Sequence, residues 1–104
     1  MARMATTFEA VAEPARRKLL DCLIEGPRPV GELVQETGLS QPNTSRHLRI
    51  LRQAGLVASS PDGQRRLYEL RPAGLAELER WLAPYRRLWR GSLDALERHL
   101  NQGE

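Results

Sequence analysis

A turn of three residues, Gly38 to Ser40, separates two amphipathic helical patterns, and this spacing constrains the fold more than any other feature. Gly38 can end the preceding helix in the left-handed conformation, and Ser40 can cap the helix that follows. Pro42 lies in the first turn of that second helix, where its missing N–H group costs no hydrogen bond. Two helices joined so closely by a glycine-containing turn are typical of a helix-turn-helix motif.

The second helix of this motif combines a narrow apolar face with an outward face rich in hydrogen-bond donors. Leu48 and Leu51 share the apolar face with Thr44. No Asp or Glu occurs between Glu36 and Asp62, and all but one of the 16 Lys and Arg residues of the chain are arginine. Guanidinium groups suit phosphates and the guanine edge. The sequence therefore predicts DNA contacts from Ser40, Gln41, Asn43, Thr44, Ser45, Arg46 and Arg49.

Three shorter helical segments are predicted before this helix. Residues 6–9 (Thr-Thr-Phe-Glu) fit a capping box that opens a first helix carrying Phe8. A second helix is expected to begin at Pro14 and to end before Gly26. A proline-rich turn then leads to a short helix over residues 30–37, which supports the helix with the polar face.

After Gly55 the pattern changes from helical to extended. Residues 56–60 and 64–70 predict two short strands around a turn at residues 61–63 (Pro-Asp-Gly). The resulting β-hairpin is a two-stranded wing beside the helix pair. Three polar residues near its turn are predicted to contact the DNA backbone, namely Gln64, Arg65 and Arg66.

From Pro72 onward, apolar residues recur in steps of three and four as far as Leu100, which is the stripe of an amphipathic helix. Pro84 cannot donate to the helical hydrogen-bond ladder, so we expect a kink or a break near residues 80–84. Burial stabilises each large apolar side chain by about 1.5–3 kcal/mol, and a small domain cannot cover the whole stripe. The sequence therefore predicts a dimer interface made of Phe8, Leu82, Tyr85, Trp89, Leu93 and Leu96.

The length of 104 residues and the composition indicate one mainly α (α+β) domain over residues 1–104. Residues 6–71 form the DNA-binding core with its wing, and residues 72–101 form dimerisation helices kinked or broken near Pro84. A single cysteine, Cys22, excludes a disulfide within the chain, and no signal peptide or membrane-spanning run is present. We therefore expect a cytoplasmic protein with no membrane partner.

No arrangement of nucleophile, base and orienting residue suggests catalysis, and no glycine-rich loop suggests a phosphate site, so neither an enzyme nor a cofactor is expected. We interpret Cys22 as a small core residue. We interpret His47 as a structural residue that is either packed or close to a DNA phosphate, in preference to a pH switch. The main alternative is a winged-helix protein-interaction module that does not bind specific DNA. The acid-free window around the polar helix favours the DNA-binding interpretation.

Two segments of the chain resemble the ArsR/SmtB family of winged-helix bacterial repressors. Residues 12–20 (Ala-Glu-Pro-Ala-Arg-Arg-Lys-Leu-Leu) resemble the start of that family's second helix, and residues 40–57 resemble its recognition-helix signature. The similarity covers roughly residues 6–82. It implies a winged helix-turn-helix homodimer that binds an imperfect palindrome in double-stranded DNA and leaves it when an effector arrives. It also implies that Gln41, Asn43, Ser45 and Arg46 approach the major groove.

The chain departs from the family where some members bind metals. The thiolate sensors carry cysteines at positions where this sequence has Pro29, Gly31 and Val34. Other members bind zinc through residues of the last helix, which here offers only His99. We therefore expect no metal site. An unknown small-molecule effector stays open as a partner, because the sequence identifies neither an effector nor the operator.

Overall fold

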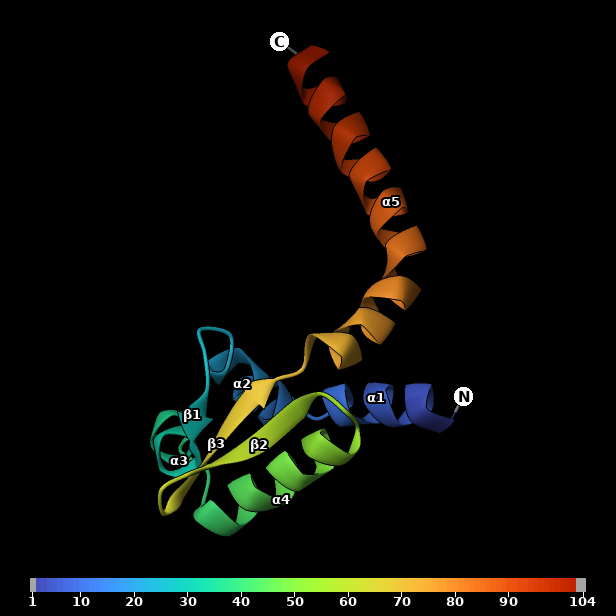
Figure 1. Ribbon diagram of the computed structural model, residues 1–104. Coiled ribbons are helices and arrows are strands. Elements are labelled where there is room, and N and C mark those ends of the chain that lie inside the picture. The colour runs from blue at the N-terminus through green and yellow to red at the C-terminus, as the bar shows by residue number, and fades with distance from the viewer. Residues whose placement is uncertain (1, 103–104) are drawn as a thin grey trace.

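The computed structural model describes the backbone of residues 2–102 and the side chains from Thr7 onward, and Figure 1 shows a body with one long helix extending from it. The predicted helix-turn-helix followed by a hairpin is confirmed. The chain forms, in order, α1 (Ala2–Ala12), α2 (Pro14–Cys22), β1 (Arg28–Pro29), α3 (Val30–Thr37), α4 (Gln41–Gln53), β2 (Val57–Asp62), β3 (Arg65–Leu70) and α5 (Pro72–Gln102).

The hydrophobic core lies where α4 packs against α2 and α3. Leu48 and Leu51 of α4 are completely buried, as are Leu19 of α2 and Leu33 of α3. Leu56, which follows α4, is also buried and connects this core to the hairpin. Because the apolar residues of α4 occupy one face only, the opposite face is left at the surface.

The turn between α3 and α4 has the predicted capping groups. Gly38 has a φ of 76°, a left-handed conformation that glycine adopts without a steric penalty, and its N–H group donates to the carbonyl of Val34. The Ser40 hydroxyl accepts a hydrogen bond from the Asn43 N–H group at 3.2 Å. These two caps fix the ends of α3 and α4, and α3 spans the predicted residues 30–37.

The sheet contains a strand that the sequence interpretation missed. Its strand order is β1-β3-β2, and β1 pairs antiparallel with β3 through Arg28 with Tyr68 and Pro29 with Leu67. The wing therefore belongs to a three-stranded sheet, not to an isolated two-stranded hairpin. A strand of two residues has no detectable alternation, and Pro29 lacks the N–H group that marks an ordinary strand residue.

The hairpin turn is shorter than predicted. β2 continues to Asp62 and β3 begins at Arg65, which leaves only Gly63 and Gln64 in the turn. Gly63 has a φ of 62°, as tight two-residue hairpin turns require.

One predicted helix boundary near the N-terminus is wrong. Because α1 begins at Ala2, Thr6 lies inside the helix and cannot be its N-cap. The local capping signal was consistent with a boundary that the folded chain does not use. α2 begins at Pro14 and ends at Cys22, with Leu23 as its C-cap, and so ends before Gly26 as predicted.

The C-terminal segment is one helix of 31 residues that continues through Pro84. Figure 1 shows that its axis bends in the orange part of the ribbon, which agrees with the predicted kink, whereas the alternative of a break is wrong. A proline removes one hydrogen bond and pushes the preceding turn aside, but the flanking turns remain helical. The protein consequently measures 61 × 34 × 21 Å along its principal axes.

We expect Gly74→Ala to destabilise the fold by about 1–3 kcal/mol, because a methyl group at this buried position would collide with the backbone carbonyl of Gly55. Gly91→Ala is the matched control, since a methyl group there meets no atom within 4 Å. The control should gain up to about 1 kcal/mol from helix propensity. Urea unfolding at one fixed protein concentration measures both changes, and equal stabilities of the two variants would contradict the close approach at Gly74.

Candidate nucleic-acid interface

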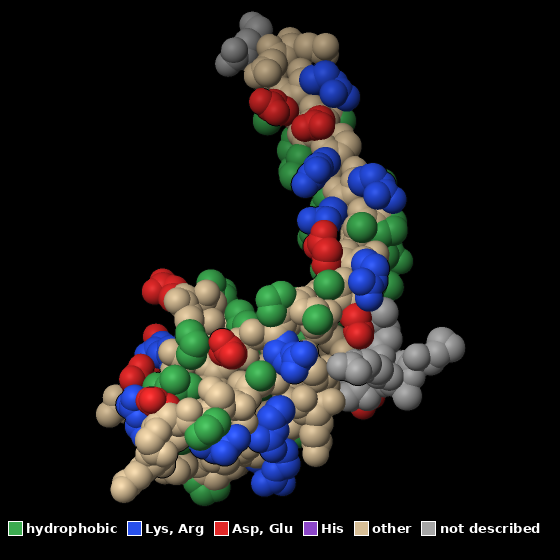
Figure 2. All heavy atoms as spheres, in the orientation of Figure 1, with side chains coloured by type: hydrophobic (Ala, Val, Ile, Leu, Met, Phe, Trp, Pro, Cys, Tyr) green, Lys and Arg blue, Asp and Glu red, His purple; other side chains and the backbone are tan. Residues whose placement is uncertain are grey.

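The outward face of α4 is exposed and basic. Figure 2 shows Lys and Arg side chains gathered over this helix at the lower front of the molecule. Arg46 and Arg49 are exposed, and neither guanidinium group bonds to another residue in the part of the chain that the structure describes. Three further predicted residues are exposed on the same helix: Gln41, Asn43 and Ser45. This face therefore offers unengaged donors and acceptors to a ligand.

Thr44 does not belong to this face, contrary to the prediction that it contacts DNA. Its side chain is completely buried, and its hydroxyl donates to the Ser40 carbonyl oxygen at 2.9 Å. The position follows the apolar stripe with Leu48 and Leu51, and the polar hydroxyl misled the assignment. Ser40 is exposed, but its own hydroxyl is occupied as the cap of α4.

The wing brings its predicted residues to an exposed tip. Gln64, Arg65 and Arg66 are all exposed, and Arg65 forms an ion pair with Asp62 at 2.7 Å. Arg66 donates to the Ser59 hydroxyl at 3.0 Å. These internal partners orient the guanidinium groups, while water still reaches them.

Ser59 links the wing to α4, a role that the sequence interpretation missed. Its hydroxyl oxygen accepts from Arg52 of α4 at 3.2 Å as well as from Arg66 of β3. One small side chain thereby holds two guanidinium groups from different elements side by side. Only the folded hairpin reveals this contact, because Ser59 is seven positions from each arginine along the chain.

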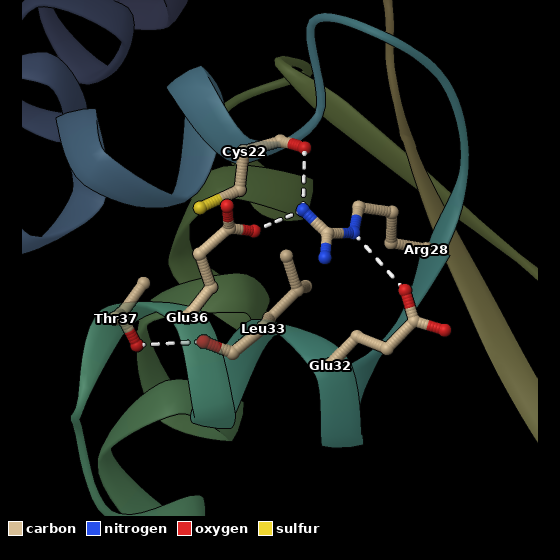
Figure 3. A network of polar contacts seen from close by, with 6 residues as sticks. All are labelled: Cys22, Arg28, Glu32, Leu33, Glu36 and Thr37. Carbon is tan, nitrogen blue, oxygen red and sulfur yellow. Dashed lines mark hydrogen bonds and ion pairs between the residues drawn. The ribbon is translucent and has the colours of Figure 1, made fainter.

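Arg28 anchors α3 to the end of α2 (Figure 3). Its guanidinium donates to the Cys22 carbonyl oxygen at 3.4 Å and to Glu32 at 3.2 Å, and it also pairs with Glu36. Hydrogen bonds to the two carboxylates raise the pKa of Arg28. Arg28 therefore connects the end of α2, strand β1 and one face of α3.

Cys22 lies beside this network and is partly buried, in agreement with a packing role. Burial raises the pKa of its thiol, and the neighbouring Glu36 carboxylate raises it further. A thiol held in its protonated form is a poor nucleophile and a poor metal ligand. Over the described residues, no three His, Cys, Asp or Glu side chains come together as metal ligands.

His47 points into the protein from α4 and is only 7% exposed, which confirms its predicted packed position. Its Nδ1 atom lies 3.3 Å from Nη1 of Arg16 on α2. Burial lowers the pKa of His47, and the guanidinium groups of Arg46 and Arg16 lower it further. All three effects favour the neutral form of the ring.

The long helix α5 carries a large uncovered apolar face. Its apolar side chains beyond the body are 50–70% exposed, and they comprise Trp81, Tyr85, Leu88, Trp89, Leu93, Leu96 and Leu100. Near the body, Phe8 of α1 meets Trp81 edge to face, with ring centroids 5.3 Å apart. Of the predicted interface residues, Phe8 and Leu82 are half-buried within the monomer. A contiguous apolar face of this kind is typical of an interaction surface.

This face does not make α5 a membrane span. Among the described residues, no helix has a run of apolar side chains long enough to cross a bilayer.

Residues 13–59 match the sequence family described as "Bacterial regulatory protein, arsR family". The chain is 44% identical over 71 residues to the HTH-type transcriptional regulator Rv2034 of Mycobacterium tuberculosis. This alignment covers 68% of this chain and 66% of that relative. It is 34% identical over 79 residues to the transcriptional repressor SdpR of Bacillus subtilis, covering 76% of this chain and 88% of that relative.

The fold is similar to solved structures of such regulators. One is the homodimeric winged helix-turn-helix DNA-binding domain of a possible ArsR-family transcriptional regulator from Mycobacterium bovis. The TM-score is 0.69 at 25% sequence identity, and the match covers 84% of this chain and 82% of that one. The chain spans only 66% of the length of the first relative above.

Proposed function

The chain belongs to the ArsR family of bacterial regulatory proteins, and we propose that it represses transcription by binding a palindromic operator as a homodimer. The outward face of α4 is the observation that carries the proposal. Arg46 and Arg49 are exposed there without a bond to any other residue that the structure describes, on a segment that lacks carboxylates. A helix face that only contacts water would have no need to exclude carboxylates from the neighbourhood of its arginines.

The N-terminal turns of α4 are the part that enters the major groove. Gln41, Asn43 and Ser45 supply donors and acceptors for base edges, and Arg46 supplies a planar pair of donors suited to guanine. The wing, with Arg65 and Arg66, lies on the adjacent phosphate backbone. Base contacts then provide sequence specificity, whereas wing contacts provide affinity that depends on salt.

Dimerisation pairs two such helices on the two halves of a palindrome. The exposed stripe on α5 and the aromatic contact between Phe8 and Trp81 support a second copy as the partner that covers it. The homodimeric relative from Mycobacterium bovis supports the same arrangement. We assign the interface to Phe8, Leu82, Tyr85, Trp89, Leu93 and Leu96.

Release from the operator does not depend on a thiophilic metal in this proposal. Tight binding of a soft divalent ion needs three or four converging thiolate or imidazole ligands. The chain offers one thiol, Cys22, whose pKa is raised by burial, and two imidazoles, the buried His47 of α4 and His99 near the end of α5.

Arg46→Ala should weaken binding to a duplex selected from a random-sequence pool by about 1–3 kcal/mol and relax specificity at one base pair. Arg66→Ala should weaken binding to all duplexes alike and reduce the salt slope by about 1, because it removes one phosphate contact. Fluorescence anisotropy at several salt concentrations measures both effects. Equal losses for both variants on every duplex would reassign Arg46 to the backbone. A wild-type chain that selects no duplex would favour the protein-interaction module instead.

Sedimentation velocity should give the wild-type chain about twice the mass of the 11.8 kDa monomer at micromolar concentration. Trp89→Asp or Leu93→Asp should shift it toward monomer, because a charge would then be buried at the interface. Asn101→Asp is the control, since it adds the same charge at an exposed position of α5 outside the proposed interface. A monomeric wild type, or a monomeric Asn101→Asp variant, would count against this interface.

Titration of the protein–DNA complex with zinc, cadmium or arsenite under reducing conditions should leave the complex intact. The physical reason is the lack of converging soft ligands. Operator binding is measured at each metal concentration, with a chelator added afterwards to test reversibility. Stoichiometric release that Cys22→Ser or His99→Ala abolishes would show that a metal site exists.

A further inference from the structure

A single guanidinium group joins α1 to the middle of α4. Arg16 of α2 donates from Nε to the Ala10 carbonyl oxygen at 2.7 Å and from Nη2 to the Glu9 carbonyl oxygen at 3.3 Å. Its Nη1 lies 3.3 Å from Nδ1 of His47. These carbonyls belong to the last turn of α1, where helix geometry provides no partner for them. Three helices therefore meet at one side chain.

The contact between Arg16 and His47 requires a neutral imidazole. Arginine has only donors, so Nδ1 of His47 must accept and the ring proton must lie on Nε2. Protonation of the ring would remove the hydrogen bond and place a second positive charge against the guanidinium group. At 7% exposure, the ring has little access to water that could screen this repulsion.

We propose that Arg16 and His47 are a positioning pair that holds α4 in its DNA-binding orientation and couples that orientation to the position of α1. The consequence for DNA affinity rests on the proposed function. α1 also contacts the proposed dimer surface, because its Phe8 packs on Trp81 of α5. Movement of α1 by a second copy or a ligand therefore displaces the carbonyls that Arg16 holds, and through His47 it displaces α4.

The charges around His47 fix the expected pH dependence. Burial lowers its pKa from the usual 6.5, Arg46 on its own helix and Arg16 on α2 lower it further, and Glu13 of α2 opposes them. From α1, the backbone carbonyls of Glu9 and Ala10 accept hydrogen bonds from Arg16, and the Glu9 side chain is exposed. The unfolded chain therefore takes up the proton at a higher pH than the folded protein. The stability linked to neutral His47 is complete above pH 6.5 and declines as the pH falls below it.

Arg17 provides a matched control. Its Nη1 donates to the Val11 carbonyl oxygen at 2.8 Å and to the Ala12 carbonyl oxygen at 3.0 Å, at the same end of α1. Arg16→Met and Arg17→Met each remove one positive charge and release two carbonyl groups of α1. Only Arg16→Met also removes a partner of His47.

The first experiment needs no DNA. NMR titration of the His47 ring in the wild-type chain should show the Nε2–H tautomer and a pKa below 6.5. Arg16→Met should raise that pKa and shift amide signals along α4, whereas Arg17→Met should change neither. A His47 titration that Arg16→Met leaves unchanged would overturn the proposal, whatever the DNA results.

The second experiment measures affinity for a duplex that the wild-type chain selects from a random-sequence pool. Arg16→Met and His47→Leu should each weaken binding about tenfold, and the double variant should lose no more than either single one. His47→Gln should retain affinity within about threefold, because its amide oxygen can accept from Arg16, and its affinity should not decline below pH 6.5 as the wild type's does. Arg17→Met should stay within about twofold of the wild type.

The results of these experiments test the coupling between α1 and α4 separately from the proposed DNA-binding function. Losses that multiply in the double variant, or a loss in Arg17→Met equal to that in Arg16→Met, would overturn the positioning pair. Urea unfolding of each variant distinguishes a displaced α4 from a chain that no longer folds. A wild-type chain that selects no duplex would contradict the proposed function, and the NMR titration would then decide the coupling between α1 and α4 by itself.

Discussion

The burial of Leu48 and Leu51 of α4 against Leu19 and Leu33 is the interaction on which the rest of the structure depends. All four side chains are completely inaccessible to water, so α4 has one permitted rotation about its axis. Fixing that rotation places every third or fourth residue inward and the polar residues between them outward. The candidate DNA-binding face is thus a consequence of core packing, and its exposed Arg46 and Arg49 make no bond to another residue that the structure describes.

Short helices need additional anchors, and arginine side chains provide them. α2 has nine residues and α3 has eight, so a large fraction of their backbone groups lie in terminal turns without internal partners. Arg16 and Arg17 bind carbonyls at the end of α1, and Arg28 binds the carbonyl of Cys22 beside two carboxylates. The arginines therefore divide into those that stabilise the fold and those, such as Arg46, that remain available to a ligand. Net charge alone does not distinguish the two groups.

The extension of α5 beyond the body links the stability of the fold to association. The body is too small to cover a 31-residue amphipathic helix, so an apolar face stays in contact with water in the single chain. Gly74 allows the first turn of this helix to approach the backbone of Gly55 closely, and Pro84 then redirects its axis. The direction in which the apolar face points is therefore set by one close backbone contact and one bend.

By itself, the sequence determined the helices α3 and α4, the turn between them, the hairpin and the amphipathic character of α5. Each of these depends on local periodicity or on a cap such as Ser40, which acts within one helical turn. The tertiary structure decided the pairing of Arg28–Pro29 with β3 and the partners of Arg16 and Arg52. These features arise between residues far apart in the chain, where a side chain's partner depends on which elements pack together and not on its neighbours in sequence.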